Sequence, residues 1–361
     1  MSVIINGISP LGYAEKACET LMRKFAPDQL PPVGRFHYHQ GVFLSGMQNT
    51  YRLTKNKKYF DYIKGWVDSI IWEDGSIHQF DPGQMDDIQP GILLFQLYKE
   101  TGDERYPKAL ATLIDAMDKY PKCKCGGFWH KDHLPYQMWL DGLYMGGPLL
   151  AEYGATFNKP EYLEIPVFQI KMMEKNTKDP KTGLWYHAWD ESREVSWADK
   201  ETGLSPEFWG RSIGWVPIAI LDVLQFLPKD HPERGDLERI IRELMTAVAK
   251  YQDEETGLWY QVVDKGGMEG NWLESSCTCL YAAAIKRAVE AGIMDKSFLP
   301  VAEKGYTGII NRLKEDEKGL IIDNVCVGTG VGDYKHYCNR PTSANDLHGV
   351  GAFLLMCTAM E

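Results

Sequence analysis

The sequence lacks a long hydrophobic run and has fewer basic than acidic residues. It contains 39 Lys and Arg against 50 Asp and Glu, which gives a formal net charge of −11. Nucleic acids and anionic membranes bind to basic surfaces, so neither is expected as a partner. No apolar stretch reaches the roughly 20 residues of a membrane span. The first residues also lack a basic segment followed by an apolar run, so we expect a cytoplasmic protein.

Several well-known site motifs are also missing. The chain has no G-x-x-x-x-G-K-[ST] loop, no Rossmann glycine fingerprint, no H-E-x-x-H and no G-x-S-x-G. Nucleotide-binding, metalloprotease and esterase classes therefore have no support. Two cysteine pairs, Cys123/Cys125 and Cys277/Cys279, have C-x-C spacing rather than the C-x-x-C spacing typical of zinc sites. We expect free thiols, with a zinc site as the weaker alternative.

What the sequence does contain is helical periodicity along nearly its whole length. Apolar residues recur every three to four positions, as on one face of a helix. One of these helices should start near Pro148, because proline cannot donate a backbone hydrogen bond inside a helix. The twelve predicted helices span residues 14–24, 39–53, 59–71, 88–100, 105–119, 148–157, 162–175, 211–226, 237–251, 273–291, 298–313 and 344–359.

Short polar connections alternate with long loops that are rich in glycine and aromatic residues. Residues 182–186 and 256–260 both read TGLWY, which indicates an internal repeat. Six helical hairpins of about 60 residues each account for the length of the chain. We therefore predict an all-α fold, an (α/α)6 barrel that forms a single domain over residues 1–361. An open α-solenoid is the alternative, but the strongly apolar last segment favours a closed ring.

Asp141 lies in the most conspicuous stretch of the chain, the apolar and aromatic residues 136–152. A buried ionised carboxylate is costly, so such a group is usually paired or has a raised pKa. On position alone, two interpretations are equally good. Asp141 either caps free N–H groups at the start of a helix, or it is a functional carboxylate that faces an interior site.

Asp86 and Asp87 also precede an apolar helix. We expect one of them to cap this helix, and the other to face the same site as Asp141. Paired carboxylates in aromatic surroundings are typical of general acid–base chemistry on sugars.

Arg211 lies between Trp209 and Trp215 at the start of another predicted helix. Its planar guanidinium matches a carboxylate through two hydrogen bonds, so a binding role is favoured. The alternative is a structural arginine that stacks on tryptophan and pairs with an acid such as Glu207.

His187 lies in an aromatic loop, where it is a candidate ligand donor or general acid, although structural histidines are common. In the turn before the last helix, Ser343, Asn345 or Asp346 is expected to cap that helix. Capping is favoured over a role for Asp346 and His348 in the site.

Taken in order, these motifs form a set that runs from near residue 36 to near residue 351. The set contains Tyr38 in HYHQGV, Asp86-Asp87-Ile88-x-Pro-Gly, Trp139-x-Asp141-Gly-x-Tyr-Met-Gly, His187, Trp209-Gly-Arg211-x-x-Gly-Trp215, Glu274-Ser-Ser, and Arg340-Pro followed by Asn345-Asp346-x-His348-Gly. It resembles the unsaturated rhamnogalacturonyl hydrolases of glycoside hydrolase family 105. More distantly, it is similar to the unsaturated glucuronyl hydrolases of family 88.

The resemblance implies an (α/α)6 barrel and a small oligosaccharide substrate that ends in a 4,5-unsaturated uronic acid. The enzyme would hydrate the C4=C5 double bond, after which the sugar opens and the aglycone leaves. Asp141 would be the general acid/base with a raised pKa, Asp86 or Asp87 would orient sugar hydroxyls, and Arg211 would bind the uronate carboxylate. The remaining substrate-binding residues would be Tyr38, Lys131, His133, Trp139, His187, Trp209, Trp215 and His348. No metal or organic cofactor is implied, and a monomer or homodimer is expected.

Unsaturated galacturonyl-rhamnose is the expected substrate, with unsaturated glucuronyl sugars as the alternative. A sugar epimerase or an inverting glycosidase on the same barrel is the competing enzyme class. A non-catalytic binding module would leave unexplained why Asp, Arg and Trp gather at the starts of alternate helices.

Overall fold

The computed structural model describes residues 3–361, whose regular secondary structure is mostly helical. The helices are α1 (Pro10–Lys24), α2 (Tyr38–Thr54), α3 (Lys57–Asp68), α4 (Ile92–Thr101), α5 (Arg105–Asp118), α6 (Asp141–Thr156), α7 (Glu161–Thr177), α8 (Gly210–Phe226), α9 (Arg234–Ala249), α10 (Ser275–Glu290), α11 (Leu299–Arg312), the short α12 (Tyr334–Cys338) and α13 (Leu347–Met360). Short 3-10 helices include η2 (Met85–Asp87) and η3 (Gln89–Gly91) ahead of α4. Over residues 3–361, no helix combines the length and apolar character needed to cross a membrane.

The few strands form three antiparallel pairs in the loops. They are β1 (Gln137–Trp139) with β2 (Ala188–Asp190), β3 (Trp259–Tyr260) with β4 (Leu273–Glu274), and β5 (Lys314–Asp316) with β6 (Gly319–Ile321).

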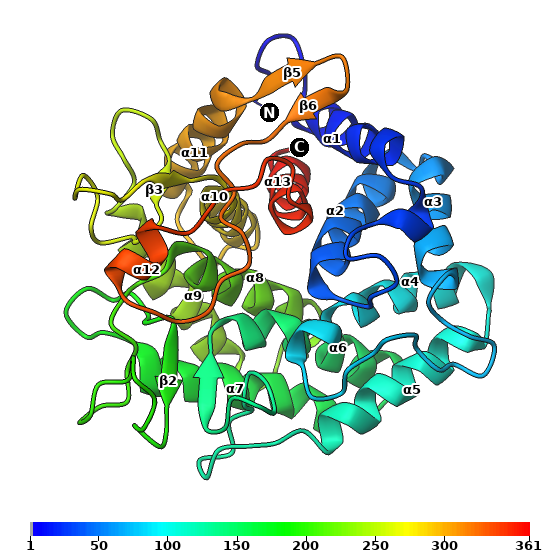
Figure 1. Ribbon diagram of the computed structural model, residues 1–361, viewed down its shortest axis with the longest axis horizontal. Helices are drawn as coiled ribbons and strands as arrows, with labels where there is room; N and C mark the ends of the chain where they lie inside the picture. The colour runs from blue at the N-terminus through cyan, green and yellow to red at the C-terminus, as the bar shows by residue number, and fades with distance from the viewer. Residues whose placement is uncertain (1–2) are drawn as a thin grey trace.

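The long helices form a closed double ring. In the inner ring, α2, α4, α6, α8, α10 and α13 each contact the next helix, and α13 returns to contact α2 (Figure 1). The outer helices α1, α3, α5, α7, α9 and α11 each pack on an inner helix. The predicted (α/α)6 barrel is confirmed, and the open solenoid is ruled out because the last inner helix contacts the first.

Close contact between α2 and α13 closes the ring. A Cβ atom on Gly46 would lie 2.5 Å from the Leu354 side chain, and one on Gly351 would lie 2.5 Å from the Val42 backbone. Only glycine at these two positions lets the helices approach so closely. The apolar last segment therefore packs as an inner helix, as the sequence indicated.

Helix α6 begins at Asp141 and not near Pro148, so that part of the prediction is wrong. Pro148 lies inside α6, and two other helices also contain an interior proline, Pro166 in α7 and Pro217 in α8. An interior proline costs a helix about 3 kcal/mol. Burial of these helices within the barrel offsets that cost, which local sequence rules do not include.

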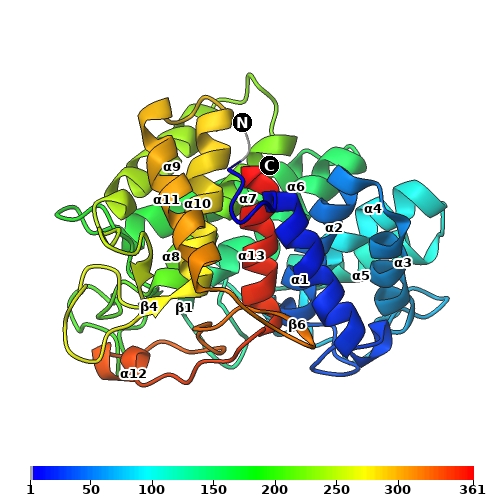
Figure 2. The same cartoon turned by 90° about the horizontal axis from the view of Figure 1, so that it is seen from above.

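The inner helices all start at the same end of the ring. Figure 2 shows β1, β4 and α12 at this end, with the start of α1 and the end of α13 on the opposite side. The N-terminus of a helix carries a partial positive charge. Six such termini therefore favour an anionic ligand at this end of an acidic protein.

The two TGLWY segments begin with the same type of turn. Asp179 accepts hydrogen bonds from the N–H and O–H of Thr182, and Asp253 does the same for Thr256. Residues 199–204 form a third copy of this turn. The aromatic pattern did not identify the third copy, because TGL is not followed by WY there.

Candidate active site

Asp141 and His187 form a hydrogen-bonded pair at the loop-bearing end of the barrel, which is the end where the inner helices start. Strand β1 leads into Asp141, and β2 follows His187 directly, so the pairing of the two strands brings the residues together. The Leu140 N–H donates to the His187 carbonyl at 3.0 Å. Asp141 Oδ2 lies 3.1 Å from His187 Nε2, and the Asp141 side chain keeps 14% of its surface exposed. Asp141 is therefore accessible, while His187 is fully buried behind it.

The pKa of Asp141 is lowered, which corrects the expected raised value. Burial raises this pKa, but the hydrogen bond and charge of His187, with the charges of His130 and Arg211, outweigh burial. Asp141 is thus ionised at neutral pH in the free protein.

The second ring nitrogen of His187 contacts a tyrosine. Nδ1 lies 2.7 Å from the Tyr337 hydroxyl, which also accepts the Gly332 N–H at 3.2 Å. Because the Asp141 carboxylate can only accept, Nε2 of His187 is the donor in this pair, and Nδ1 faces the Tyr337 hydroxyl. Tyr337 was not identified from the sequence, since it follows His187 by 150 residues and lies in no recognisable motif.

Asp86 is the acid of the doublet that faces this cluster. The segment before it pairs with the loop before β1, through a bridge between Gln84 and Lys131. Asp86 Oδ2 lies 2.9 Å from Lys131 Nζ, and Asp86 Oδ1 lies 3.9 Å from His130 Nε2. Burial raises the pKa of Asp86, but the charges of His130 and Lys131 oppose it, and the pKa is lowered overall.

His130 connects the two acids and was missed by the sequence analysis. Its ring stacks on Trp139 at 4.3 Å, and its charge acts on both Asp86 and Asp141. Burial lowers the pKa of His130 to about 4, so Lys131 is the charged partner of Asp86 at neutral pH. The available signal was the aromatic loop of residues 126–133 (GGFWHKDH), from which Lys131 and His133 were selected instead.

Asp87 does not face the cluster. Its side chain is fully buried, where it accepts the Asp81 N–H at 3.0 Å and pairs with Arg35 at 3.2 Å. Burial raises its pKa to about 6. Asp87 is therefore a structural residue that holds the 81–87 turn. Neither it nor Asp86 makes the capping hydrogen bond expected of one of them.

Arg211 is a positioning residue in this structure. It is 2% exposed and stacks over Trp209 at 4.6 Å. Its guanidinium donates to the carbonyls of Cys326 at 2.6 Å and Val327 at 2.9 Å, so its fork does not present the expected clamp for a carboxylate. The alternative pairing with Glu207 is also wrong, because Glu207 pairs with Lys265.

The loop that starts at Cys326 is held by residues at the starts of three inner helices. Glu274 accepts the Cys326 N–H at 2.9 Å, and His348 Nε2 lies 3.0 Å from the Cys326 carbonyl. Together with the two hydrogen bonds from Arg211, these contacts hold the loop so that Gly328 lies beside Tyr38 and Gly330 lies beside Trp139. The Glu274-Ser-Ser motif thus serves the site through this loop.

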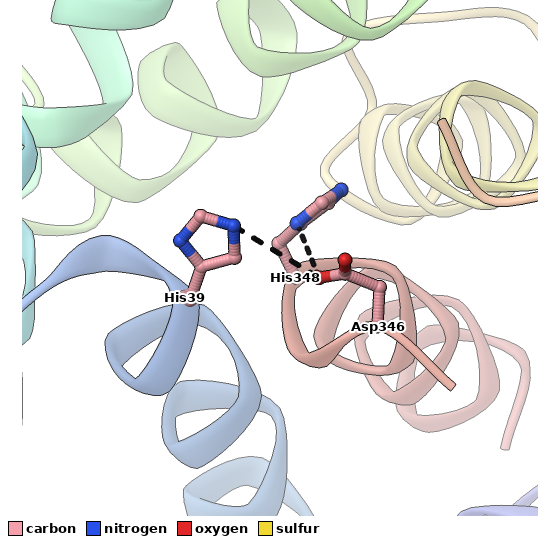
Figure 3. A group of neighbouring side chains, drawn as sticks. All are labelled: His39, Asp346 and His348. Carbon is pink, nitrogen blue, oxygen red and sulfur yellow. Dashed lines mark ion pairs between the residues drawn. The ribbon is translucent and has the colours of Figure 1, made fainter. Parts of the chain in front are cut away.

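His39, Asp346 and His348 lie together, as Figure 3 shows. The Tyr38 ring lies against both histidines. Asp346 Oδ1 lies 2.8 Å from His348 Nδ1 and 3.9 Å from His39 Nε2. Burial raises the pKa of Asp346, but the His348 hydrogen bond and charge lower it overall. Asp346 makes no capping bond to α13, so the expected capping role is wrong. Asn345 does not cap either, because its amide bonds the backbone of residues 320 and 322.

The remaining predicted site residues divide by exposure. Tyr38 and Trp139 are partly exposed at the cluster. Trp209 is 1% exposed, with its ring against His187 at 4.6 Å. Trp215 is also 1% exposed and stacks on Tyr144 at 4.6 Å, so it belongs to the core.

Two further predicted residues do not line the accessible part of the cluster. His348 is fully buried behind Tyr38 and His39. His133 is 63% exposed and lies against the neighbouring Asp132. Neither placement supports direct contact with a substrate.

A closed (α/α)6 barrel with a carboxylate–histidine pair among tryptophans at one end agrees with a glycoside hydrolase of the toroidal type. The chain belongs to Glycosyl Hydrolase Family 88, whose family model matches residues 13–361. This confirms the resemblance found in the sequence.

Individual relatives agree with this assignment. The chain is 28% identical over 297 residues to the unsaturated rhamnogalacturonyl hydrolase YesR of Bacillus subtilis (strain 168), covering 81% of this chain and 79% of that protein. A solved family 105 glycoside hydrolase of C. acetobutylicum ATCC 824 superposes with a TM-score of 0.92 at 36% identity, covering 96% of this chain and 99% of that one. The unsaturated glucuronyl hydrolase of Bacillus sp. GL1 shares the fold, with a TM-score of 0.71 at 15% identity over 96% of this chain and 95% of that one.

Proposed function

We propose that this glycoside hydrolase releases a 4,5-unsaturated uronic acid from the non-reducing end of lyase-generated oligosaccharides by hydrating the C4=C5 double bond. A proton adds to C4 and the oxygen of water adds to C5, which gives a hemiketal. The hemiketal opens to a ketone at C5 and leaves a hemiacetal at C1. The hemiacetal then expels the aglycone as an alcohol and becomes an aldehyde.

The Asp141–His187 pair carries this proposal. In its acid form Asp141 gives its proton to C4, and as a carboxylate it then removes a proton from the water that attacks C5. His187 holds Asp141 in one orientation through Nε2 at 3.1 Å. Asp86, held by Lys131 at 2.9 Å, is placed to accept hydrogen bonds from sugar hydroxyls.

The acid form of Asp141 must arise when substrate binds, because its pKa is lowered in the free protein. A bound uronate brings negative charge and displaces water, and both raise the pKa of a nearby carboxyl. Lys131 and the helix N-termini supply the opposite charge that holds the substrate. The proposal therefore includes proton uptake on substrate binding.

Replacing His187 by phenylalanine tests whether His187 lowers the pKa of Asp141. The hydrogen bond and charge of His187 are the largest effects that lower the pKa of Asp141, so their loss raises that pKa. More of the free enzyme then carries the proton at a given pH. The falling limb of the kcat/KM profile should move to higher pH, while the maximum falls because Asp141 is less well oriented. A limb that stays in place or moves to lower pH would contradict the assigned pair.

Unsaturated galacturonyl-rhamnose is the proposed substrate, supported by the similarity to the rhamnogalacturonyl hydrolase of Bacillus subtilis. The conjugated C=C–carboxylate of such a sugar absorbs ultraviolet light, and hydration removes the absorbance. We expect loss of absorbance with unsaturated galacturonyl-rhamnose at a higher kcat/KM than with unsaturated glucuronyl disaccharides. The reverse order would assign the enzyme to glucuronyl sugars. No loss with either class would refute the proposed reaction.

A further inference from the structure

Two cysteines in the loop before β1 have no part in the site described above. Cys123 and Cys125 lie on a tight turn, in which the Cys123 N–H donates to the Gly127 carbonyl at 2.7 Å. Glu191 follows β2 directly and reaches this turn from 66 residues away along the chain. Its carboxylate accepts the N–H groups of Lys124 at 2.7 Å and Cys125 at 2.9 Å. The carboxylate is therefore held in place beside both thiols.

The three side chains converge on one point. The two Sγ atoms and a carboxylate oxygen of Glu191 all lie within 4.8 Å of one another. A tetrahedral zinc ion with Zn–S bonds of about 2.3 Å keeps its sulfur ligands roughly 3.8 Å apart, so three such atoms fit around one ion. The Met138 thioether lies 4.0 Å from Cys125 Sγ, which adds a further soft donor next to the group. Cys123 is buried but Cys125 is partly exposed, which leaves a side open for the ion and a water ligand.

The charge of the group also favours a cation. Over residues 3–361, no Lys, Arg or His forms an ion pair with Glu191. The second C-x-C pair is different, because Cys277 and Cys279 lie on α10 with both thiols fully buried. The carboxylate beside them, Glu274, is also fully buried, so this group has no open side for an entering ion.

We propose that Cys123, Cys125 and Glu191 bind one thiophilic divalent cation of the zinc type. Both thiols bind as thiolates, so two protons are released for each ion bound. The ion would tie the turn to the outer end of the β1–β2 pair, whose inner end leads to Asp141 and His187. It would thereby fix the loop that carries His130 and Lys131.

Cadmium titration of the whole protein tests the proposal, because thiolate-to-cadmium charge transfer produces an ultraviolet absorbance band. We expect one equivalent of Cd²⁺ to produce the band in the wild type and in Cys338→Ser, a control at another partly exposed thiol. The band should be lost in a Cys123→Ser/Cys125→Ser double variant. Glu191→Gln should weaken Cd²⁺ binding by roughly 10-fold or more, since a charged ligand is lost.

A second measurement needs no variant. Zn²⁺ should slow alkylation of Cys125 by iodoacetamide in the wild-type protein but not that of Cys338, as followed by mass spectrometry of the peptides. A wild type that gives no cadmium band, a double variant that keeps the band, or equal alkylation of Cys125 with and without Zn²⁺ would overturn the proposal. None of these readouts depends on the substrate or on catalytic activity.

Discussion

Replacing Asp141 by asparagine is expected to lower kcat by about 10³-fold or more on an unsaturated galacturonyl disaccharide, within the range typical of a lost general acid–base group. Asparagine keeps the size of the side chain and an oxygen that can accept from His187 Nε2. It cannot give a proton to C4 or take one from water. Binding should change little, so the loss should appear in kcat rather than in KM, measured as the rate of absorbance loss.

A matched control separates chemistry from a general loss of structure. Asp115→Asn changes an exposed acid of α5 whose side chain pairs with the neighbouring Lys119 and with no residue of the site. It should leave kcat unchanged, and both variants should show the far-ultraviolet circular dichroism of the wild type. A kcat for Asp141→Asn within tenfold of wild type would remove Asp141 from the acid–base role and make Asp86 the next candidate.

Neutralising Asp86 and Asp87 in turn should give very different results. Asp86→Asn is expected to reduce kcat/KM by about 10²-fold, because the carboxylate beside Lys131 is the proposed acceptor for sugar hydroxyls. Asp87→Asn should reduce kcat/KM by less than about tenfold, since this fully buried side chain contacts Arg35 and the backbone of Asp81.

Asp87 should instead affect stability as a function of pH. Burial raises its pKa from the ordinary value of 3.8 to about 6 in the folded protein. The folded state therefore binds more protons between these values, and the free energy of unfolding falls as pH rises through this window. Asp87→Asn should remove that slope in chemical denaturation at pH 4 to 7. In the kinetic comparison, equal losses of kcat/KM in Asp86→Asn and Asp87→Asn would contradict the assignment of Asp86 to the site.

The barrel could be predicted from the sequence because its signals are local and repeated. Each inner helix is apolar, and the functional residues precede or begin these runs, as Asp86, Asp141 and Arg211 do. The start of α6 was misjudged because the cost of Pro148 is local, whereas the compensating burial comes from neighbouring helices. Helix identity was thus readable, but one boundary depended on tertiary packing.

The partners of the site residues could not be read in the same way. Tyr337 reaches His187 from 150 residues away, and the fork of Arg211 is taken by carbonyls at residues 326 and 327. The direction of the Asp141 pKa shift depends on which charges come near it, and periodicity does not encode this. Long-range contacts therefore decided which of the predicted residues are accessible and which are structural.

The most direct test of the proposed hydration is the wild-type reaction in D₂O with unsaturated galacturonyl-rhamnose, followed by nuclear magnetic resonance of the released sugar. Addition of a proton to C4 by Asp141 predicts one deuterium at C4, in a single stereochemical position, formed at the rate at which rhamnose is released. Hydrolysis at the anomeric carbon would instead release rhamnose before any deuterium enters C4, and later non-enzymatic uptake would label both positions. That second result would contradict the account.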